Sequence, residues 1–296
     1  MPKLPIPEEE LMLSGHVGCL GCGATLAMRY VLKALGKNTV LSIPACCWAV
    51  MPGVYPHRCL EVPMMYTAFE TTGASISGLR AAYDAKGVKD VNVVGFAGDG
   101  GTADIGIQAL SGMVERGTNA FYIMYDNEAY MNTGIQRSSA TPFGAWTTTT
   151  PGWEWKRQPK KNMVEIMAAH NIPYTATMSV AYPEDMIKKL RKGIEIQGPK
   201  FYHIYAPCPT GWRLSPELTI HISRLAVDSC VFPLYEVIYG RYIINRKPRK
   251  KLPVGEYLKL QGRFRHLTEA EIEEIQRAVD QEWEILLRKE EISREE

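Results

Sequence analysis

The chain has 296 residues, of which 46% are hydrophobic and 22% charged, with a net charge of +2. This composition is ordinary for a soluble globular protein, and the length suits one large α/β domain with appendages or two small domains. The small net charge argues against nucleic-acid and membrane-surface partners, and no apolar run is long enough to span a bilayer. Residues 1–10 lack an apolar core and end in three glutamates, so they do not resemble a signal peptide. We therefore expect a cytoplasmic protein.

Segments typical of strands alternate with segments typical of helices, which predicts an α/β fold with a mainly parallel sheet covered by helices on both faces. Strands are expected over residues 39–43, 91–97, 120–125, 174–178, 200–205 and 242–244. Helices are expected over residues 23–35, 72–85, 103–115, 162–170, 183–196, 215–229 and 268–289. The alternation stops after Cys230. We therefore predict an N-terminal arm (1–14), one α/β domain (15–235) and a C-terminal extension (236–296) with a terminal helix.

Two polar segments lie outside this pattern. Residues 133–161 are rich in Thr, Gly, Pro and Trp and have neither helical nor strand periodicity, which predicts a long loop of the kind that is often functional. Its aromatic residues are expected to pack rather than to take part in chemistry. Residues 246–251 include five basic side chains in six positions, which favours a solvated loop over a binding surface for an acidic partner.

A glycine-rich turn follows the apolar segment 91–97, and Asp126-Asn127 follows the next apolar segment. Both lie at the carboxyl ends of predicted strands, so Asp99 and Asn127 can supply oxygen ligands to one Mg²⁺ on a diphosphate. A backbone carbonyl in the bend after Asn127 could add a third oxygen. Three glycines let the backbone approach the phosphates without a Cβ atom in the way: Gly98, Gly100 and Gly101. The alternative is a simple strand-end turn.

The sequence contains seven cysteines, and Cys19 and Cys22 form a close pair just before a predicted helix. A zinc site would need a second close pair or suitably spaced histidines, and a thioredoxin-like dithiol would follow a strand, so an iron–sulfur cluster is favoured. Cys208 and either Cys46 or Cys47 follow predicted strands, whose carboxyl ends meet at one edge of a parallel sheet. Spacing alone does not choose between Cys46 and Cys47. The two remaining cysteines are expected to be buried thiols: Cys59 and Cys230.

Four segments in this order closely resemble the beta subunits of multi-subunit 2-oxoacid:ferredoxin oxidoreductases, especially the pyruvate enzymes. They are residues 15–23 (GHVGCLGCG), 98–101 (GDGG), 127–134 (NEAYMNTG) and 207–212 (PCPTGW). The resemblance extends from about residue 15 to about residue 266. It implies the thiamine diphosphate-binding fold, of the type that holds the diphosphate, with thiamine diphosphate, Mg²⁺ and one [4Fe–4S] cluster as cofactors.

The resemblance also implies roles for individual residues. The family's cluster ligands correspond to Cys19, Cys22, Cys47 and Cys208; Cys47 is preferred over Cys46 because residues 47–50 match the family pattern of a cysteine, a large apolar residue, a variable residue and valine.

Metal binding corresponds to Asp99, Asn127 and the Ala129 carbonyl, and the diphosphate is expected to contact residues 98–101. Asn132 matches a catalytic asparagine that faces the reactive carbon, where it would donate a hydrogen bond to the substrate. Single-chain relatives have glutamate where this sequence has Ala24, and the multi-subunit forms resemble this chain there.

The implied reaction is oxidative decarboxylation of a 2-oxoacid to acyl-CoA and CO₂, with electrons passing one at a time through the [4Fe–4S] cluster to ferredoxin. Pyruvate is the first expected substrate; a branched-chain 2-oxoacid, 2-oxoglutarate or oxalate is the alternative. A non-oxidative thiamine decarboxylase with a structural metal and a non-catalytic electron-transfer subunit are the competing functions. The acid that contacts the thiamine pyrimidine has no candidate here, so an alpha subunit is expected to supply it and a ferredoxin-like gamma subunit to carry electrons onward.

Overall fold

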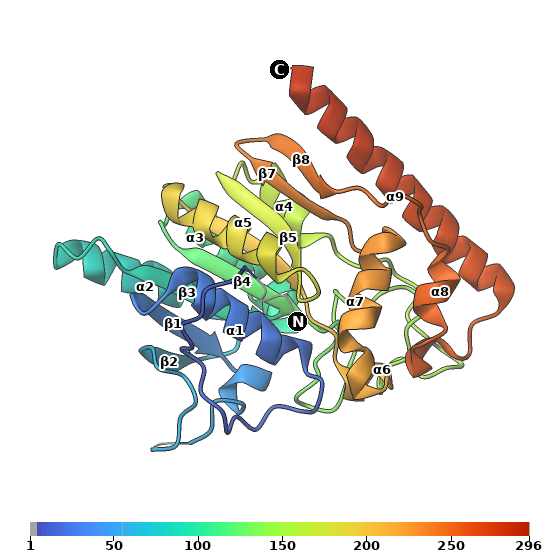
Figure 1. Cartoon of the computed structure of the whole chain (residues 1–296), viewed down its shortest axis with the longest axis horizontal. Coiled ribbons are helices and arrows are strands. Elements are labelled where there is room, and N and C mark those ends of the chain that lie inside the picture. The colour runs from blue at the N-terminus through green and yellow to red at the C-terminus, as the bar shows by residue number, and fades with distance from the viewer. Residues whose placement is uncertain (1–4, 55, 296) are drawn as a thin grey trace.

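The computed structural model describes residues 5–54 and 56–295. Within them, eight strands form one sheet in the order β2-β1-β3-β4-β6-β5-β7-β8 (Figure 1). Strands β1 to β6 pair in parallel, while β7 and β8 are added in antiparallel orientation. The strands are β1 (Thr39–Pro44), β2 (Met64–Thr67), β3 (Asn92–Gly98), β4 (Phe121–Asp126), β5 (Tyr174–Ser179), β6 (Lys200–Tyr205), β7 (Leu234–Ile238) and β8 (Arg241–Arg246).

Helices cover both faces of the sheet, as expected for a parallel sheet whose central strands are buried along their whole length (Figure 1). α1 (Gly23–Leu35) and α5 (Pro183–Glu195) pack against each other on one face. The helices on the opposite face are α2 (Thr72–Ala85), α3 (Ile107–Glu115), α4 (Met163–Ala169) and the end of α9 (Glu269–Glu295). A third apolar cluster joins α6 (Pro209–Trp212), α7 (Thr219–Asp228) and α8 (Val254–Leu258). The helices among the described residues are too short or too polar to cross a lipid bilayer.

The predicted α/β fold with a mainly parallel sheet is confirmed, including the bounds of α1, α2 and β6. The expected helix over 103–115 is instead a π-helical turn, Gly101–Ile105, followed by α3. Four elements were not predicted: β2, β7, α6 and α8. The division of the chain at residues 14 and 235 stays a prediction, although β7 and β8 extend the same sheet without a break.

Because β1, β3, β4 and β6 run in parallel, their carboxyl ends meet at one edge of the sheet. The chain leaves these ends into the turns that contain Cys46-Cys47, Asp99, Asn127 and Cys208. A glycine supports the packing beside this edge. A Cβ atom on Gly73, in the first turn of α2, would lie 2.4 Å from the carbonyl oxygen of Ala109 in α3. The fold thus brings four sequence-distant turns to one place.

Candidate active site

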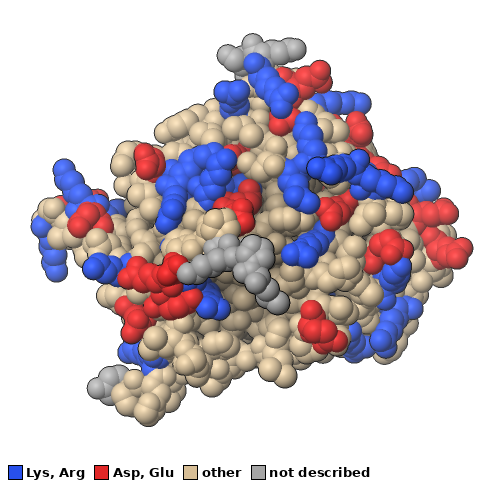
Figure 2. Space-filling view, viewed as in Figure 1, with Lys and Arg blue, Asp and Glu red and all other residues tan. Residues whose placement is uncertain are grey.

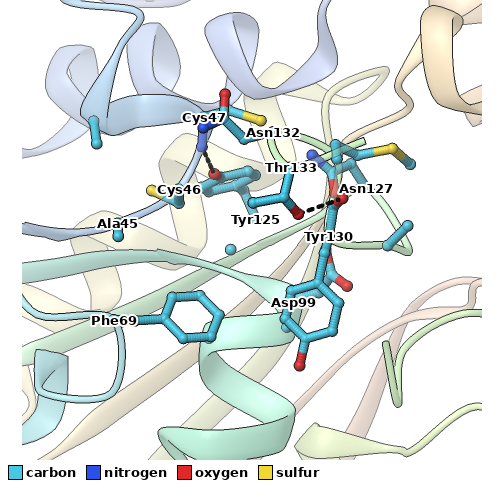
Figure 3. A pocket seen from close by; sticks show the side chains of 16 residues that line it. Ala45, Cys46, Cys47, Phe69, Asp99, Tyr125, Asn127, Tyr130, Asn132 and Thr133 are labelled. Carbon is cyan, nitrogen blue, oxygen red and sulfur yellow. Dashed lines mark hydrogen bonds between the residues drawn. The ribbon is translucent and has the colours of Figure 1, made fainter. Parts of the chain in front are cut away.

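A cavity of about 300 Å³ opens at the carboxyl ends of β1, β3 and β4 (Figure 3). Three turns line it, within residues 45–49, 98–101 and 125–133, together with Phe69. The structure therefore brings together every residue that the sequence assigned to the diphosphate and its metal, and the predicted catalytic residue Asn132 lines the same cavity. The assigned residues are Gly98, Asp99, Gly100, Gly101, Asn127 and Ala129. Asn132 is exposed at the open side of this cavity, whereas Asp99 and Asn127 are buried.

Asp99 is a buried carboxyl group, with 1% of its surface exposed. The hydroxyl of Ser138 donates a 2.6 Å hydrogen bond to its Oδ2. Burial, and after it the negative charge of Asp126, raises the pKa of Asp99 well above its usual range. An ionised carboxylate here is poorly compensated by the protein, so a cation in the cavity would stabilise it.

The side chain of Asn127 can present either its oxygen or its nitrogen to two other oxygen atoms. With its nitrogen inward, it donates hydrogen bonds of 3.0 Å to the Ala129 carbonyl and 2.9 Å to Asp99 Oδ1. With its oxygen inward, three oxygen atoms face one another at these distances, an arrangement that is repulsive unless a cation lies among them. A carboxylate, an amide oxygen and a backbone carbonyl form a donor set that suits Mg²⁺.

The turn beside Asp99 passes close to aromatic side chains. A Cβ atom at Gly100 would lie 2.3 Å from the ring of Tyr130, and one at Gly101 would lie 3.1 Å from the ring of Phe69. The Tyr130 hydroxyl donates to Asp104, 2.5 Å away in the π-helical turn, which holds the ring in that position. Any larger residue at position 100 would clash with this ring, so the close approach requires glycine.

The predicted cluster cysteines lie on three turns, and a backbone hydrogen bond links the turn of Cys19 and Cys22 to the turn of Cys208. Cys22 is the N-cap residue of α1, and its backbone N–H donates a 3.2 Å hydrogen bond to the Cys19 carbonyl. The N–H of Gly23 donates a 2.9 Å hydrogen bond to the Pro207 carbonyl. The sulfur of Cys208 caps α6, accepting a hydrogen bond of 3.3 Å from the Gly211 N–H. The Cys19–Cys22 turn is thereby fixed beside the turn that carries Cys208.

Burial, and after it the neighbouring cysteines Cys46, Cys208 and Cys22, raises the pKa of the Cys47 thiol to about 12. Burial also raises the pKa of Cys208 to about 11, with Cys22 and Cys19 as its thiol neighbours. The four cysteines that the resemblance assigned to the cluster thus share one neighbourhood. Among the described side chains, no group of three or more His, Cys, Asp or Glu residues is arranged to hold a single metal ion.

Cys46 lies in the same turn as Cys47 but is oriented differently (Figure 3). Burial raises its pKa, and the neighbours that lower it are the hydroxyl of Tyr125 and nearby backbone amides, including that of Gly98. The Cys46 side chain therefore lies beside Tyr125 and Gly98, while Cys208 and Cys22 are among the neighbours of the Cys47 thiol. Cys59 and Cys230 are buried away from this group, as expected for structural thiols.

A buried ionic network behind the turn of residues 126–129 was not predicted from the sequence. Lys160 lies 2.5 Å from both Asp126 and Glu128, and Arg263 lies 2.5 Å from Glu128. Burial raises the pKa of Asp126, but Lys160 and His203 outweigh burial and hold the pKa below its usual range. The sequence signal that could have indicated this network is the pair of carboxylates on either side of Asn127, at the end of a buried strand.

Residues 48–204 match the family described as "Thiamine pyrophosphate enzyme, C-terminal TPP binding domain". The chain is 55% identical to the ketoisovalerate oxidoreductase subunit VorB of Pyrococcus abyssi, with 96% of this chain and 94% of the relative covered. It is 51% identical to the pyruvate synthase subunit PorB of Methanocaldococcus jannaschii, covering 97% and 99%.

A solved structure, the 2-oxoglutarate:ferredoxin oxidoreductase from Magnetococcus marinus with 2-oxoglutarate, coenzyme A and succinyl-CoA bound, superposes with a TM-score of 0.59. The alignment covers 74% of this chain and 82% of that one, at 20% identity. At this identity the likeness supports the shared fold.

Proposed function

The chain belongs to the 2-oxoacid:ferredoxin oxidoreductase beta subunits, and we propose that it holds the diphosphate and Mg²⁺ of thiamine diphosphate beside one [4Fe–4S] cluster. The observation that carries this proposal is the convergence of Asp99, Asn127 and the Ala129 carbonyl in a cavity bordered by Cys47. When bound, thiamine diphosphate would supply the carbon nucleophile and electron sink for decarboxylation, and the cluster would accept single electrons.

The protein's own part in this chemistry is to bind and orient. Asp99, Asn127 and the Ala129 carbonyl would hold Mg²⁺, while the backbone of residues 98–101 would approach the phosphates. Burial of Asp99 makes it bind a cation strongly, because an unpaired buried carboxylate is unfavourable. Asn132, at the open side of the cavity, would donate a hydrogen bond to the substrate carboxylate or to the oxygen that gains negative charge.

The cluster would be held by Cys19, Cys22, Cys47 and Cys208. Thiolates are the ligands of iron–sulfur clusters, and iron binding lowers the pKa that burial raises. Cys47 also lines the cavity, so the cluster would lie next to the cofactor and receive electrons directly from it. This placement favours an oxidative reaction over a non-oxidative decarboxylation.

The site is expected to be completed by other subunits. Several apolar side chains near the cysteine turns are strongly exposed: Val17 (62%), Leu20 (82%), Val50 (53%) and Val54 (80%). The lower edge of the molecule in Figure 2 is mostly uncharged, which suits a covered surface. We assign this edge to the alpha subunit, which would supply the acid on the pyrimidine. A ferredoxin-like gamma subunit and external ferredoxin would then carry the electrons away.

The substrate would be a 2-oxoacid, with coenzyme A as acyl acceptor. The two relatives named above are a pyruvate synthase subunit and a ketoisovalerate oxidoreductase subunit. Pyruvate is the substrate we propose first, and the branched-chain acid is the alternative. Turnover of pyruvate, 2-oxoisovalerate, 2-oxoglutarate and oxalate by the reconstituted complex would decide among them.

The cofactors are tested by the contents of the complex purified without oxygen. Iron and thiamine together support the proposal, whereas zinc without iron would refute it. Asp99→Ala should remove thiamine diphosphate and leave iron in place, because Asp99 contacts the proposed metal and not the cysteines. Retention of thiamine by this variant would show that the metal site is assigned wrongly.

A further inference from the structure

Arg263 is a buried cation, 2% exposed, that reaches the active site from outside the α/β domain predicted from the sequence. It lies between α8 and α9, in the segment that the sequence assigned to a C-terminal extension. Residues of its own segment orient the guanidinium. Nε and Nη2 donate hydrogen bonds of 3.0 and 2.8 Å to Gln261 Oε1. Nη2 also donates a 3.3 Å hydrogen bond to the Tyr257 hydroxyl. Such a side chain has little freedom to move.

On one side, Arg263 holds the metal-binding turn. Its Nη2 donates to Glu128 Oε2 at 2.5 Å. In the sequence, Glu128 lies between Asn127 and Ala129, whose oxygens face Asp99. Its backbone has a φ of 68°, a left-handed conformation that residues other than glycine rarely adopt. This conformation is what turns the Asn127 side chain and the Ala129 carbonyl toward one point, so the contacts that fix Glu128 also fix those two oxygens.

On the other side, Arg263 holds the Cys208 turn. The guanidinium carbon lies 3.9 Å from the ring centroid of Trp212, the last residue of the turn that Cys208 caps. The indole N–H of Trp212 in turn donates 2.8 Å to the backbone carbonyl of Asn127. The two turns touch here: a Cβ atom at Gly211 would lie 2.2 Å from the sulfur of Met131.

We propose that Arg263 is a positioning residue that fixes the Asn127–Ala129 turn and the Cys208 turn against each other, through Glu128 and Trp212. This inference rests on the proposed function, since it assigns Mg²⁺ to one turn and the cluster to the other. One buried guanidinium thereby contributes to the arrangement of the metal-binding oxygens, where Lys160 also holds Glu128, and to the position of a cluster ligand. A lysine cannot replace it fully, because it lacks the planar group that stacks on Trp212 while reaching Glu128.

The test uses the reconstituted complex carrying Arg263→Met, Arg263→Lys or Trp212→Phe. Loss of a residue that orients metal ligands typically weakens metal affinity by about 10- to 100-fold. We expect Arg263→Met to raise by that factor the Mg²⁺ concentration that half-saturates thiamine diphosphate binding. Arg263→Lys should raise it less, and Trp212→Phe, which keeps an aromatic ring but loses the N–H donor, should also raise it less. The electron paramagnetic resonance spectrum of the reduced cluster should change in Arg263→Met while iron content is kept.

Arg80→Met is the matched control. Arg80 is another buried arginine; it donates to the carbonyls of Val88 (2.6 Å) and Val91 (3.1 Å) and forms a 2.7 Å ion pair with Asp84, remote from both turns. The Arg80→Met variant should lower the stability of the protein without changing the Mg²⁺ dependence of thiamine diphosphate binding or the spectrum of the cluster.

Unchanged Mg²⁺ dependence and spectrum in Arg263→Met would overturn the inference, as would equal effects in Arg80→Met. If Arg263→Met does not assemble, Arg263→Lys decides: wild-type Mg²⁺ dependence in that variant overturns the inference, and a raised requirement supports it. A wild-type complex that binds neither thiamine nor iron would instead refute the proposed function, so the two failures are distinguishable.

Discussion

The hydroxyl oxygen of Tyr125 accepts a 3.1 Å hydrogen bond from the backbone N–H of Cys47 (Figure 3). Tyr125 belongs to β4 and Cys47 follows β1, with β3 between these strands. The phenol therefore crosses β3, and it does so over Gly98, where a Cβ atom would lie 3.3 Å from the hydroxyl. The bond ties the turn of a proposed cluster ligand to the strand that leads into the proposed metal-binding turn.

Tyr125→Phe removes this bond while keeping the ring, which stacks on Phe96 at 5.3 Å between centroids. The Cys47 N–H then loses its partner, at a cost of about 1 to 3 kcal/mol. We expect the variant to bind thiamine diphosphate normally and to release iron to a chelator faster than the wild type. Loss of thiamine with unchanged iron release would contradict this reading of the bond.

The neighbouring cysteines Cys46 and Cys47 offer a matched pair of substitutions. Cys47→Ser should lower the iron content of the purified complex sharply, because its thiol has Cys22 and Cys208 among its neighbours. Cys46→Ser should keep the iron, because its thiol faces Tyr125 and Gly98. Iron and sulfide analysis of both variants checks the prediction, and the reverse pattern would assign the ligand to Cys46.

Much of this fold follows from local pattern. α1 and α2 have the predicted bounds, and the last helix begins with a capping box, in which the Thr268 N–H donates a 2.7 Å hydrogen bond to Glu271. β7 escaped prediction because it buries a carboxylate, Glu236, which Tyr174 and Lys192 satisfy at 2.6 and 2.7 Å. These partners lie far from Glu236 in the sequence, so the residue pattern of β7 alone does not predict that the strand is buried.

The same limit applies to the site. Asp99 and Asn127 were predicted to lie close together because the carboxyl ends of parallel strands in one sheet meet at the same edge. Arg263 was not predicted to lie near this site, because its partner Glu128 is 135 residues away in the sequence. Its segment has no motif, and only tertiary packing brings it behind the metal turn. The choice of Cys47 needed either a family pattern or the orientation of its thiol.

Gly100→Ala tests whether the glycine-rich turn needs its close approach to Tyr130. The added Cβ atom would lie 2.3 Å from the ring, so the ring or the turn must move. We expect the variant to fold, since the clash lies at the edge of the cavity, and to lose most of its affinity for thiamine diphosphate. Gly78→Ala is the control, because an added Cβ atom there meets no neighbour within 4 Å. Binding measured by quenching of tryptophan fluorescence should be normal in the control, and normal binding in Gly100→Ala would contradict the prediction.

Lys200 predicts a stability effect that is independent of the active site. Its ammonium group is buried, donating to Asn119 Oδ1 at 2.6 Å, and burial, followed by the charge of Arg80, lowers its pKa from the usual 10.5 to about 8. Between these pH values the unfolded chain binds more protons at this position than the folded chain, so this residue makes stability rise with pH. From pH 8 to pH 10 the wild type should gain about 2 kcal/mol of unfolding free energy relative to Lys200→Met, which has no such group. Denaturant unfolding of both proteins at the two pH values measures this difference. A constant difference, or a gain by the variant, would show that Lys200 titrates normally in the folded protein.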